Sequence, residues 1–215
     1  MTKPVKHYIP SSTKLPRRAP GRPRQFDEAR ALAAARGVFV DKGLAATTLD
    51  DLTEAMQINR PSLYGAFTDK ETLYLKTIDG YAAEMVAKAG AALAGAPDIK
   101  QALKQFYAAA LDVYTGGGAH PVGCFIVTSA VPEAVTNPRI ATRAAEILRG
   151  LDAALEHRLR RAMEDGQLPR KADPAALAAI AGSILHSLAV RARAGERRKA
   201  LDALAANAVR MITTG

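Results

Sequence analysis

The sequence lacks most of what disulfide-bonded, metal-binding or membrane-spanning proteins need. Its 215 residues include one cysteine, Cys124, so an internal disulfide is excluded. The four histidines are scattered, so we expect no metal site and no cofactor. No stretch approaches the roughly 18 uninterrupted apolar residues of a membrane span. No apolar run follows the basic N-terminus as in a signal peptide. We therefore expect a cytoplasmic protein that has no membrane partner.

Aromatic residues are scarce at 5%, and tryptophan is absent. Alanine, leucine, arginine and glutamate dominate, and these residues favour helices. Apolar residues recur at helical spacing, whereas no segment alternates as a strand does. The sequence therefore predicts an all-α protein with about nine helices.

Acidic residues are missing from the first 24 positions, which contain seven lysines or arginines and five prolines. Proline prevents a helix from starting there, so residues 1–24 are predicted to be a flexible basic arm. The whole chain has a formal net charge of +9. This charge favours nucleic acid, an anionic membrane or an acidic protein as partner, although it also suits a solubilising surface.

Start and stop signals mark three helices after the arm. Gly43 ends the first helix, and Thr47 or Thr48 can cap a short second one. Asn59 can cap a third helix, with Pro61 in its first turn. The sequence Thr68-Asp69-Lys70-Glu71 is a capping box that predicts the start of a long helix.

Two short helices separated by a tight turn make residues 47–67 the candidate functional motif. The outward face of the second helix is small and polar, with Arg60, Ser62 and Gly65. This pattern is typical of a helix-turn-helix, whose second helix lies in the major groove of DNA. Arg60 can reach guanine or a phosphate, Ser62 a base or the backbone, and Tyr64 a phosphate. An ordinary helical hairpin is the alternative.

The run from residue 24 to residue 81 resembles the tetracycline-repressor (TetR/AcrR) family of transcriptional regulators. The matching motifs are Gly21-Arg22-Pro23-Arg24, Ala34-Ala35, Val38-Phe39, Lys42-Gly43, Thr48-Leu49-Asp50-Asp51-Leu52, Ser62-Leu63-Tyr64, Phe67 and Lys70-Glu71-Thr72-Leu73. The resemblance implies an N-terminal three-helix helix-turn-helix domain and a larger helical ligand-binding and dimerisation domain. It also implies a homodimer whose last two helices form a four-helix interface.

The resemblance also implies roles for individual residues. Thr47 or Thr48 and Tyr64 are expected to hold phosphates, and so is Lys70 at a helix N-terminus. The outward residues of the third helix, Arg60, Pro61, Ser62 and Gly65, are expected to face bases. Two residues depart from the family pattern. Many members have Gly or Ala in place of Pro61, and many have His in place of Gly65. The details of operator reading therefore remain open.

The end of the arm, Pro20-Gly21-Arg22-Pro23-Arg24, resembles the core of an AT-hook. In this hypothesis Arg22 and Arg24 enter a narrow minor groove beside the operator. The alternative is a solvated tail that adds only salt-sensitive, non-specific affinity. We divide the chain into the arm (1–24), a DNA-binding domain (25–69) and an effector-binding and dimerisation domain (70–215).

Larger apolar residues in the middle helices are candidates for a ligand pocket, with simple core packing as the alternative. They are Met85, Phe106, Tyr107, Tyr114 and Phe125. His186 lies in an apolar stretch, where it can orient a ligand or serve as a hydrogen-bonded packing residue. The Gly123-Cys124 pair resembles one found at this place in several regulators of the family. If it opens a helix, Cys124 is a candidate thiol sensor, and otherwise it is an inert buried residue.

The apolar helix predicted after Pro174 is rich in small residues and suits a dimer bundle together with the last helix. The predicted interface residues are Leu177, Ile180, Ile184, Leu188, Leu201 and Leu204. Core packing within one chain is the alternative. A dimer also fits two-fold symmetric DNA half-sites.

These features together predict a repressor that binds double-stranded operator DNA as a homodimer and leaves it when an unknown small molecule binds the C-terminal domain. The alternatives are a DNA-binding protein without small-molecule control and a thiol-based sensor that acts through Cys124. His120 and Cys124 are the only pair suggestive of an enzyme. They have no supporting motif, so we expect no enzymatic activity.

Overall fold

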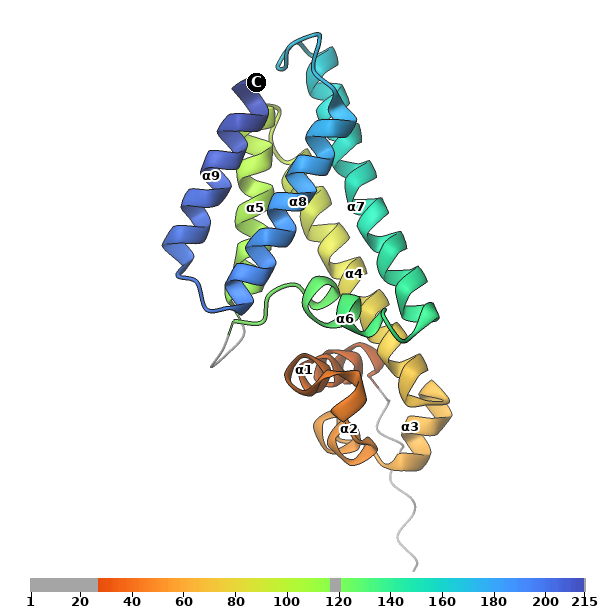
Figure 1. Cartoon of the computed structure of the whole chain (residues 1–215). Helices are drawn as coiled ribbons and strands as arrows, with labels where there is room; N and C mark the ends of the chain where they lie inside the picture. Colours follow the sequence, from red (N-terminus) through yellow and green to blue (C-terminus); the bar gives the residue numbers. More distant parts are fainter. Residues whose placement is uncertain (1–26, 117–120, 215) are drawn as a thin grey trace, which may run out of the picture.

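The computed structural model describes residues 27–116 and 121–214. All regular secondary structure in these residues is helical (Figure 1). The nine α-helices of these described residues are α1 (Glu28–Ala46), α2 (Leu49–Met56), α3 (Arg60–Phe67), α4 (Lys70–Ala94), α5 (Ile99–Thr115), α6 (Val131–Glu133), α7 (Pro138–Glu164), α8 (Pro174–Arg193) and α9 (Arg198–Thr214). A π-helical turn, η1 (Ile126–Ala130), precedes α6. The described residues contain no strand, so the all-α prediction is confirmed.

Helices α1, α2 and α3 form a compact unit around a small apolar core. Phe39 of α1, Leu52 of α2, and Leu63 and Phe67 of α3 are each at most 1% exposed. Helical dihedrals break at Gly43, whose φ of 75° lies in the left-handed region that glycine tolerates best. The chain therefore turns at Gly43 toward α2, as its sequence position predicts.

The start of α4 differs from the prediction by one residue. Asp69, not Thr68, is the N-cap, and its carboxylate accepts a hydrogen bond from the Thr72 N–H at 2.6 Å. Thr68 instead ends α3 with a φ of 60°, and its N–H bonds to the Tyr64 carbonyl. The predicted capping box at Thr68 is therefore wrong. The connection is so short that Thr68 closes the preceding helix.

Helix α4 joins the three-helix unit to the C-terminal half of the chain (Figure 1). Tyr74 of α4 packs edge-on against Phe39 of α1 at 4.8 Å and against Phe125 at 5.6 Å, measured between ring centroids. The Tyr74 hydroxyl is 2.8 Å from Ser129 Oγ in η1. Burial raises the pKa of Tyr74 to about 12, so the phenol stays protonated. A continuous buried contact therefore connects α1, α4 and η1.

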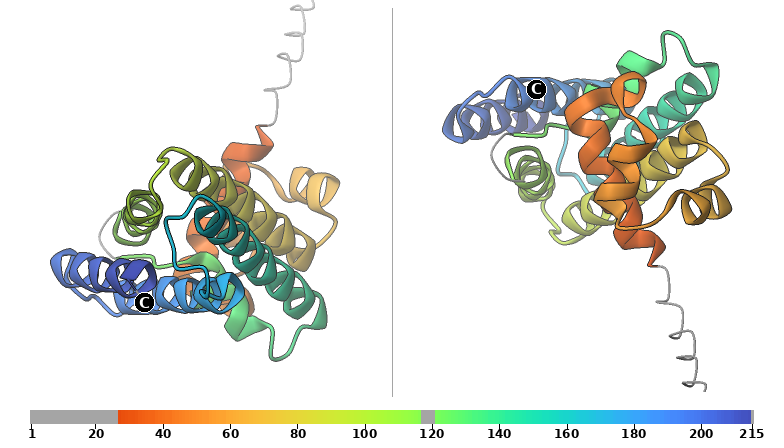
Figure 2. Two further views of the ribbon diagram at one scale, coloured as in Figure 1. Left: turned by 90° about the horizontal axis from the view of Figure 1, so that it is seen from above. Right: turned by 90° about the horizontal axis from the view of Figure 1, so that it is seen from below.

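Helices α8 and α9 lie side by side at one edge of the molecule (Figure 2). Among the described residues, α8 is long and apolar enough to cross a membrane by length and composition alone. The core helix of a soluble protein passes the same test. Helix α8 packs against α5, α7 and α9, and seven of its residues are buried. Its apolar character therefore has a packing explanation.

Candidate nucleic-acid interface and ligand cavity

The α2–turn–α3 geometry depends on local capping. Thr48 Oγ1 accepts a hydrogen bond from the Asp51 N–H, and the Asp51 carboxylate accepts one from the Thr48 N–H. The hydrogen bonds from Lys42 and Thr48 lower the pKa of Asp51 from 3.8 to about 2. Because this pKa is lower in the folded than in the unfolded chain, the ionised Asp51 carboxylate stabilises the fold at pH values above the unfolded pKa. This contribution is lost as the pH falls toward about 2. Asn59 caps α3 by accepting from the Ser62 N–H at 2.8 Å.

The outward face of α3 is exposed, as a groove-reading helix requires. Arg60, Pro61, Ser62, Tyr64 and Gly65 are all exposed, and Tyr64 keeps 49% of its surface accessible. A Cβ atom added at Gly65 would have no neighbour within 4 Å. The face is therefore small and polar, with one aromatic hydroxyl beside it.

Thr47 and Thr48 differ in what they can offer to a phosphate. Thr47 is only 2% exposed, and its hydroxyl donates to the Gly43 carbonyl at 2.5 Å. Thr48 is exposed, and its oxygen accepts in the capping box, so its hydroxyl proton is free to donate. Thr48 therefore remains the candidate phosphate contact. Thr47 does not, because it closes the turn after α1.

Arg60 is held by an acidic neighbour in the absence of DNA. Its Nη2 and Nε lie 2.8 and 3.2 Å from Asp50 Oδ1. Both side chains are more than half exposed, so the pair contributes little to stability and can open readily. A phosphate or a guanine would have to displace Asp50 from Arg60. Only an acceptor that binds the guanidinium more strongly than Asp50 does would therefore engage Arg60.

Lys70 has a structural role that sequence reasoning missed. Its ammonium donates to the carbonyls of Leu44 and Thr47, both at 2.8 Å. These carbonyls end α1 and precede α2, so Lys70 ties the helix-turn-helix to α4. An ammonium has three donors, so one N–H remains for the predicted phosphate contact.

Replacing Lys70 with methionine is expected to destabilise the protein by about 2 kcal/mol, because two carbonyls lose a charged donor. The melting temperature should fall by about 4–8 °C, as measured by circular dichroism. Lys104→Met is the control, because Lys104 is exposed on α5 and makes no hydrogen bond or ion pair with the described residues. Its replacement should change stability by less than about 0.5 kcal/mol. Equal melting temperatures for the two variants would contradict the bracing role of Lys70.

Charge is distributed unevenly between the arm and the folded DNA-binding unit. Residues 27–69 contain four basic and seven acidic residues, which gives this unit a net charge of −3. The seven cations of the arm leave only +2 for the rest of the chain. Arg22 and Arg24 lie outside the described residues. By charge alone, attraction to DNA therefore depends on the arm.

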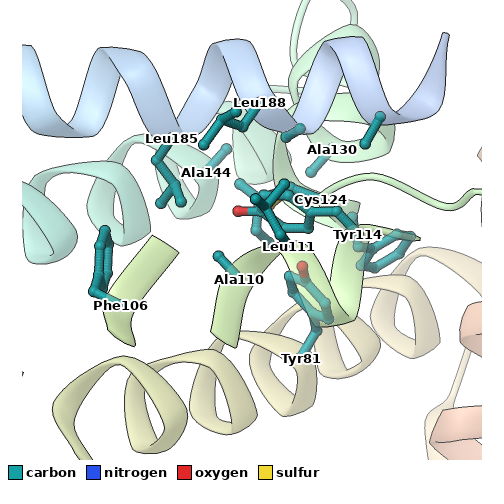
Figure 3. Close-up of a cluster of buried hydrophobic side chains, with 14 of the residues drawn as sticks. Tyr81, Phe106, Ala110, Leu111, Tyr114, Cys124, Ala130, Ala144, Leu185 and Leu188 are labelled. Carbon is teal, nitrogen blue, oxygen red and sulfur yellow. The ribbon is translucent and has the colours of Figure 1, made fainter. Parts of the chain in front are cut away.

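The C-terminal half contains a cavity of about 570 Å³, which we call the α4–α8 cavity. Its walls come from α4, α5, η1, α7 and α8. Figure 3 shows Phe106 and Ala110 of α5, Tyr81 of α4 and Leu185 of α8 in the buried cluster at this place. Five of the predicted ligand residues line the cavity, namely Met85, Phe106, Tyr114, Cys124 and His186.

Two predicted ligand residues do not line this cavity. Tyr107 faces α8 and donates its hydroxyl to the Ala181 carbonyl at 3.0 Å, so it is a satisfied core residue. Phe125 packs between Tyr74 and Tyr81. The sequence predicted that both are apolar and inward. It could not show that neither side chain faces the cavity.

Tyr81 is a lining residue that the sequence analysis did not propose for the ligand site. Tyr81 is 4% exposed, and its hydroxyl lies beside the Cys124 thiol and the Phe125 backbone without a well-formed hydrogen bond to the described residues. The Arg36 guanidinium of α1 lies over its ring, 5.4 Å from the centroid. Tyr81 therefore contacts both the cavity and the DNA-binding unit.

Cys124 is buried and directly precedes the helical turn at η1. The Thr128 N–H bonds to the Cys124 carbonyl at 2.8 Å, and the thiol neighbours Tyr81 and Tyr114. His120, the other member of the pair considered for an enzyme, lies outside the described residues. Because Cys124 is buried and lines the α4–α8 cavity, a reagent would reach its thiol through the cavity.

The predicted dimer residues divide into two groups. Leu188 and Leu201 are fully buried within the protomer, so they have no surface to offer a second copy. Leu177, Ile184 and Leu204 are partly buried, and Ile180 is 50% exposed. Val190 and Met211, which were not predicted, are 53% and 74% exposed on the same two helices. Several apolar side chains of α8 and α9 are thus open to solvent.

Comparison with known proteins matches both halves of the chain. The family model described as "Bacterial regulatory proteins, tetR family" matches residues 31–77, and "Tetracyclin repressor-like, C-terminal domain" matches residues 100–208. The HTH-type transcriptional repressor ComR of Escherichia coli (strain K12) is 29% identical over 201 residues, 93% of this chain and 95% of that protein. BdcR, a repressor of the same organism, is 41% identical over 69 residues, 32% of this chain and 35% of that protein.

Among solved structures, a cysteine mutant of the TetR family transcriptional regulator CifR, complexed with double-strand operator DNA, superposes with a TM-score of 0.78. It is 30% identical and covers 88% of this chain and 98% of its own. The similarity thus extends over the helix-turn-helix and the cavity-bearing half together.

Proposed function

This chain belongs to the TetR family of bacterial regulatory proteins, and we propose that it is a repressor that releases its operator when a small molecule occupies the α4–α8 cavity. Membership makes the chain a DNA-binding transcriptional regulator. Release by a ligand, the homodimer and a cytoplasmic location belong to the proposal. The observation that carries it is Tyr81, whose hydroxyl faces the cavity while its ring contacts Arg36 of α1.

Ligand and DNA binding are coupled if the ligand favours one position of α1 and α4 over another. Helix α1 packs against α2 and α4, and both of these contact the recognition helix α3. The two recognition helices of a dimer must lie about 34–36 Å apart. A ligand that displaces Tyr81 would move Arg36 and with it α1. Only a difference in ligand affinity between the two arrangements shifts the equilibrium.

Two alternatives use the same fold. A regulator without small-molecule control would leave the cavity empty, but two unsatisfied polar atoms in its walls, Tyr81 Oη and His186 Nε2, favour an occupant. A thiol sensor would react at Cys124. The position of Cys124 in the wall favours a reagent small enough to enter.

The test begins with selection of binding sites from a random duplex pool. A palindromic site that is bound far more tightly than random duplex then serves as probe for release by a library of small molecules. A flat selection would contradict the repressor. A specific site that no compound releases, even with Cys124 alkylated, would favour control without a small molecule.

Arg36→Gln is expected to weaken ligand-induced release while leaving operator affinity nearly unchanged. Glutamine can still bond to Glu84, but the contact over the Tyr81 ring, worth about 0.5–1 kcal/mol, is lost. The ratio of operator affinities without and with a releasing compound should fall about threefold, as measured by fluorescence anisotropy. Lys76→Gln is the control, because it cuts another α1–α4 link that does not touch the cavity. Equal loss in both variants would argue against a Tyr81 route.

A further inference from the structure

We propose that the α4–α8 cavity selects an uncharged, mainly aliphatic molecule with one hydroxyl or carbonyl group, which hydrogen-bonds to Tyr81 and His186. This inference rests on the proposed function, because it names the chemical class of the effector. It is carried by the walls of the cavity, by the position of its charged residues and by its unsatisfied polar atoms.

The walls of the cavity are apolar over most of their area. Helices α4, α5, α7 and α8 contribute alanine, leucine, isoleucine, valine and methionine side chains, with Phe106 as an aromatic wall. A volume of about 570 Å³ is in the range of small-molecule sites. An aliphatic chain fits such a site, and each buried methylene strengthens binding about fourfold.

The charged lining residues lie at the rim and mostly neutralise one another. Arg143 of α7 bridges to Asp79 of α4 at 2.5 Å and to Glu146 at 2.9 Å, and all three side chains are 39–52% exposed. Lys88 is exposed and has no ion-pair partner among the described residues. A charged group placed deep in the cavity would therefore lose its hydration without meeting an oppositely charged lining residue, because the Asp152 carboxylate near His186 does not line the cavity.

Two buried polar atoms in the cavity walls have no well-formed hydrogen bond to the described residues. The Tyr81 hydroxyl is one, and Figure 3 shows it pointing from α4 toward the cluster that contains Cys124. His186 Nε2 of α8 is the other. Buried polar atoms are normally hydrogen-bonded, so such a pair marks the place of a missing partner. A ligand hydroxyl can both donate and accept, and a carbonyl can accept from either group.

Both groups are uncharged near pH 7. Burial raises the pKa of Tyr81, so its hydroxyl is a donor. Burial lowers the pKa of His186 below 6.5, although the nearby Asp152 carboxylate opposes the shift. Tyr114, whose pKa burial also raises, and the Cys124 thiol complete this wall. A neutral head group therefore meets neutral partners.

Isothermal titration of the full-length protein with four probes of equal chain length tests the proposal. These are 1-octanol, 2-octanone, octanoate and octylammonium at pH 7.5. We expect the alcohol or the ketone to bind at least tenfold more tightly than either ion. Equal or tighter binding of octanoate would overturn the proposal in favour of an anion held at Lys88, and binding of none of the four would overturn it as well.

Tyr81→Phe tests the head-group contact and Tyr107→Phe is the matched control. Loss of the Tyr81 hydroxyl should weaken binding of the better neutral probe about fivefold and leave the melting temperature of the free protein unchanged or higher. Tyr107→Phe should leave that affinity unchanged but lower the melting temperature by about 2–4 °C, because its hydroxyl is bonded to Ala181. Wild-type probe affinity in Tyr81→Phe would overturn the assignment.

The titration separates this inference from the proposed function. If octanol binds in the cavity but releases no operator at saturation, ligand-controlled repression fails and the cavity chemistry stands. If an ion binds instead and releases the operator, ligand control stands and the chemistry proposed here is wrong.

Discussion

Replacing Ile180 with glutamate is expected to break the proposed homodimer into monomers and to weaken operator binding at least about a hundredfold. Ile180 is 50% exposed on α8, with Leu177 and Ile184 on the same face of that helix. A carboxylate there would be buried without a partner in the interface, while in the monomer it remains in water. Sedimentation velocity reports the oligomeric state, and anisotropy reports the affinity for the selected operator.

Val135→Glu is the matched control, because Val135 is also an exposed β-branched apolar residue, 87% accessible, but lies between α6 and α7 and lines no part of the α4–α8 cavity. It should leave the dimer and operator affinity unchanged. A dimeric Ile180→Glu protein with wild-type operator affinity would show that α8 and α9 do not form the interface. The expected loss is large because a monomer engages one half-site, and the second half-site no longer benefits from a tethered partner.

Removal of Arg22 and Arg24 together is expected to lower operator affinity tenfold or more near physiological salt, because the folded unit beside them is net acidic. If each arginine neutralises one phosphate, a dimer loses four contacts, and the slope of log K against log salt should decrease by about 4. Affinity is measured by anisotropy at several salt concentrations between about 50 and 300 mM, and the slope is taken from this series.

Lys3→Ala with Lys6→Ala is the control, because it removes the same charge at positions farther in sequence from the helix-turn-helix. If the arm is only a non-specific tail, both double variants should lose similar affinity for every sequence. If Arg22 and Arg24 read a minor groove, their loss should also remove any preference for A·T-rich flanks, which the lysine variant keeps. An unchanged slope in both variants would show that the arm does not contact DNA.

The start signals of the helices could be read from the sequence because they are local. Asn59 before Pro61 caps α3 as predicted, and the same signal, Asn137 before Pro138 and Asp173 before Pro174, caps α7 and α8. The capping box at Thr68 was wrong, since Thr68 closes α3 and Asp69 opens α4. Two helix ends that share a two-residue connection compete for the same residue, and local propensity does not decide between them.

The candidate sites were predictable in outline because an outward polar face or an inward apolar one follows from helical periodicity. The partner of each side chain was not. Thr47 is buried and donates its hydroxyl to the Gly43 carbonyl, and Lys70 bonds to the end of α1. Such contacts depend on how helices pack, and residues far apart in the chain set them.

By itself the sequence determined that this protein is all-helical, carries a helix-turn-helix and has its excess positive charge in an N-terminal arm. Composition, periodicity and capping are properties of neighbouring residues, so they are written in the chain directly. Only the tertiary structure decided that Tyr81 links a cavity to Arg36, that Leu188 and Leu201 are core residues, and which polar atoms lack partners. These depend on the packing of α4 between α1, α5 and α7, because a helix face is lined, satisfied or left open only by what lies against it.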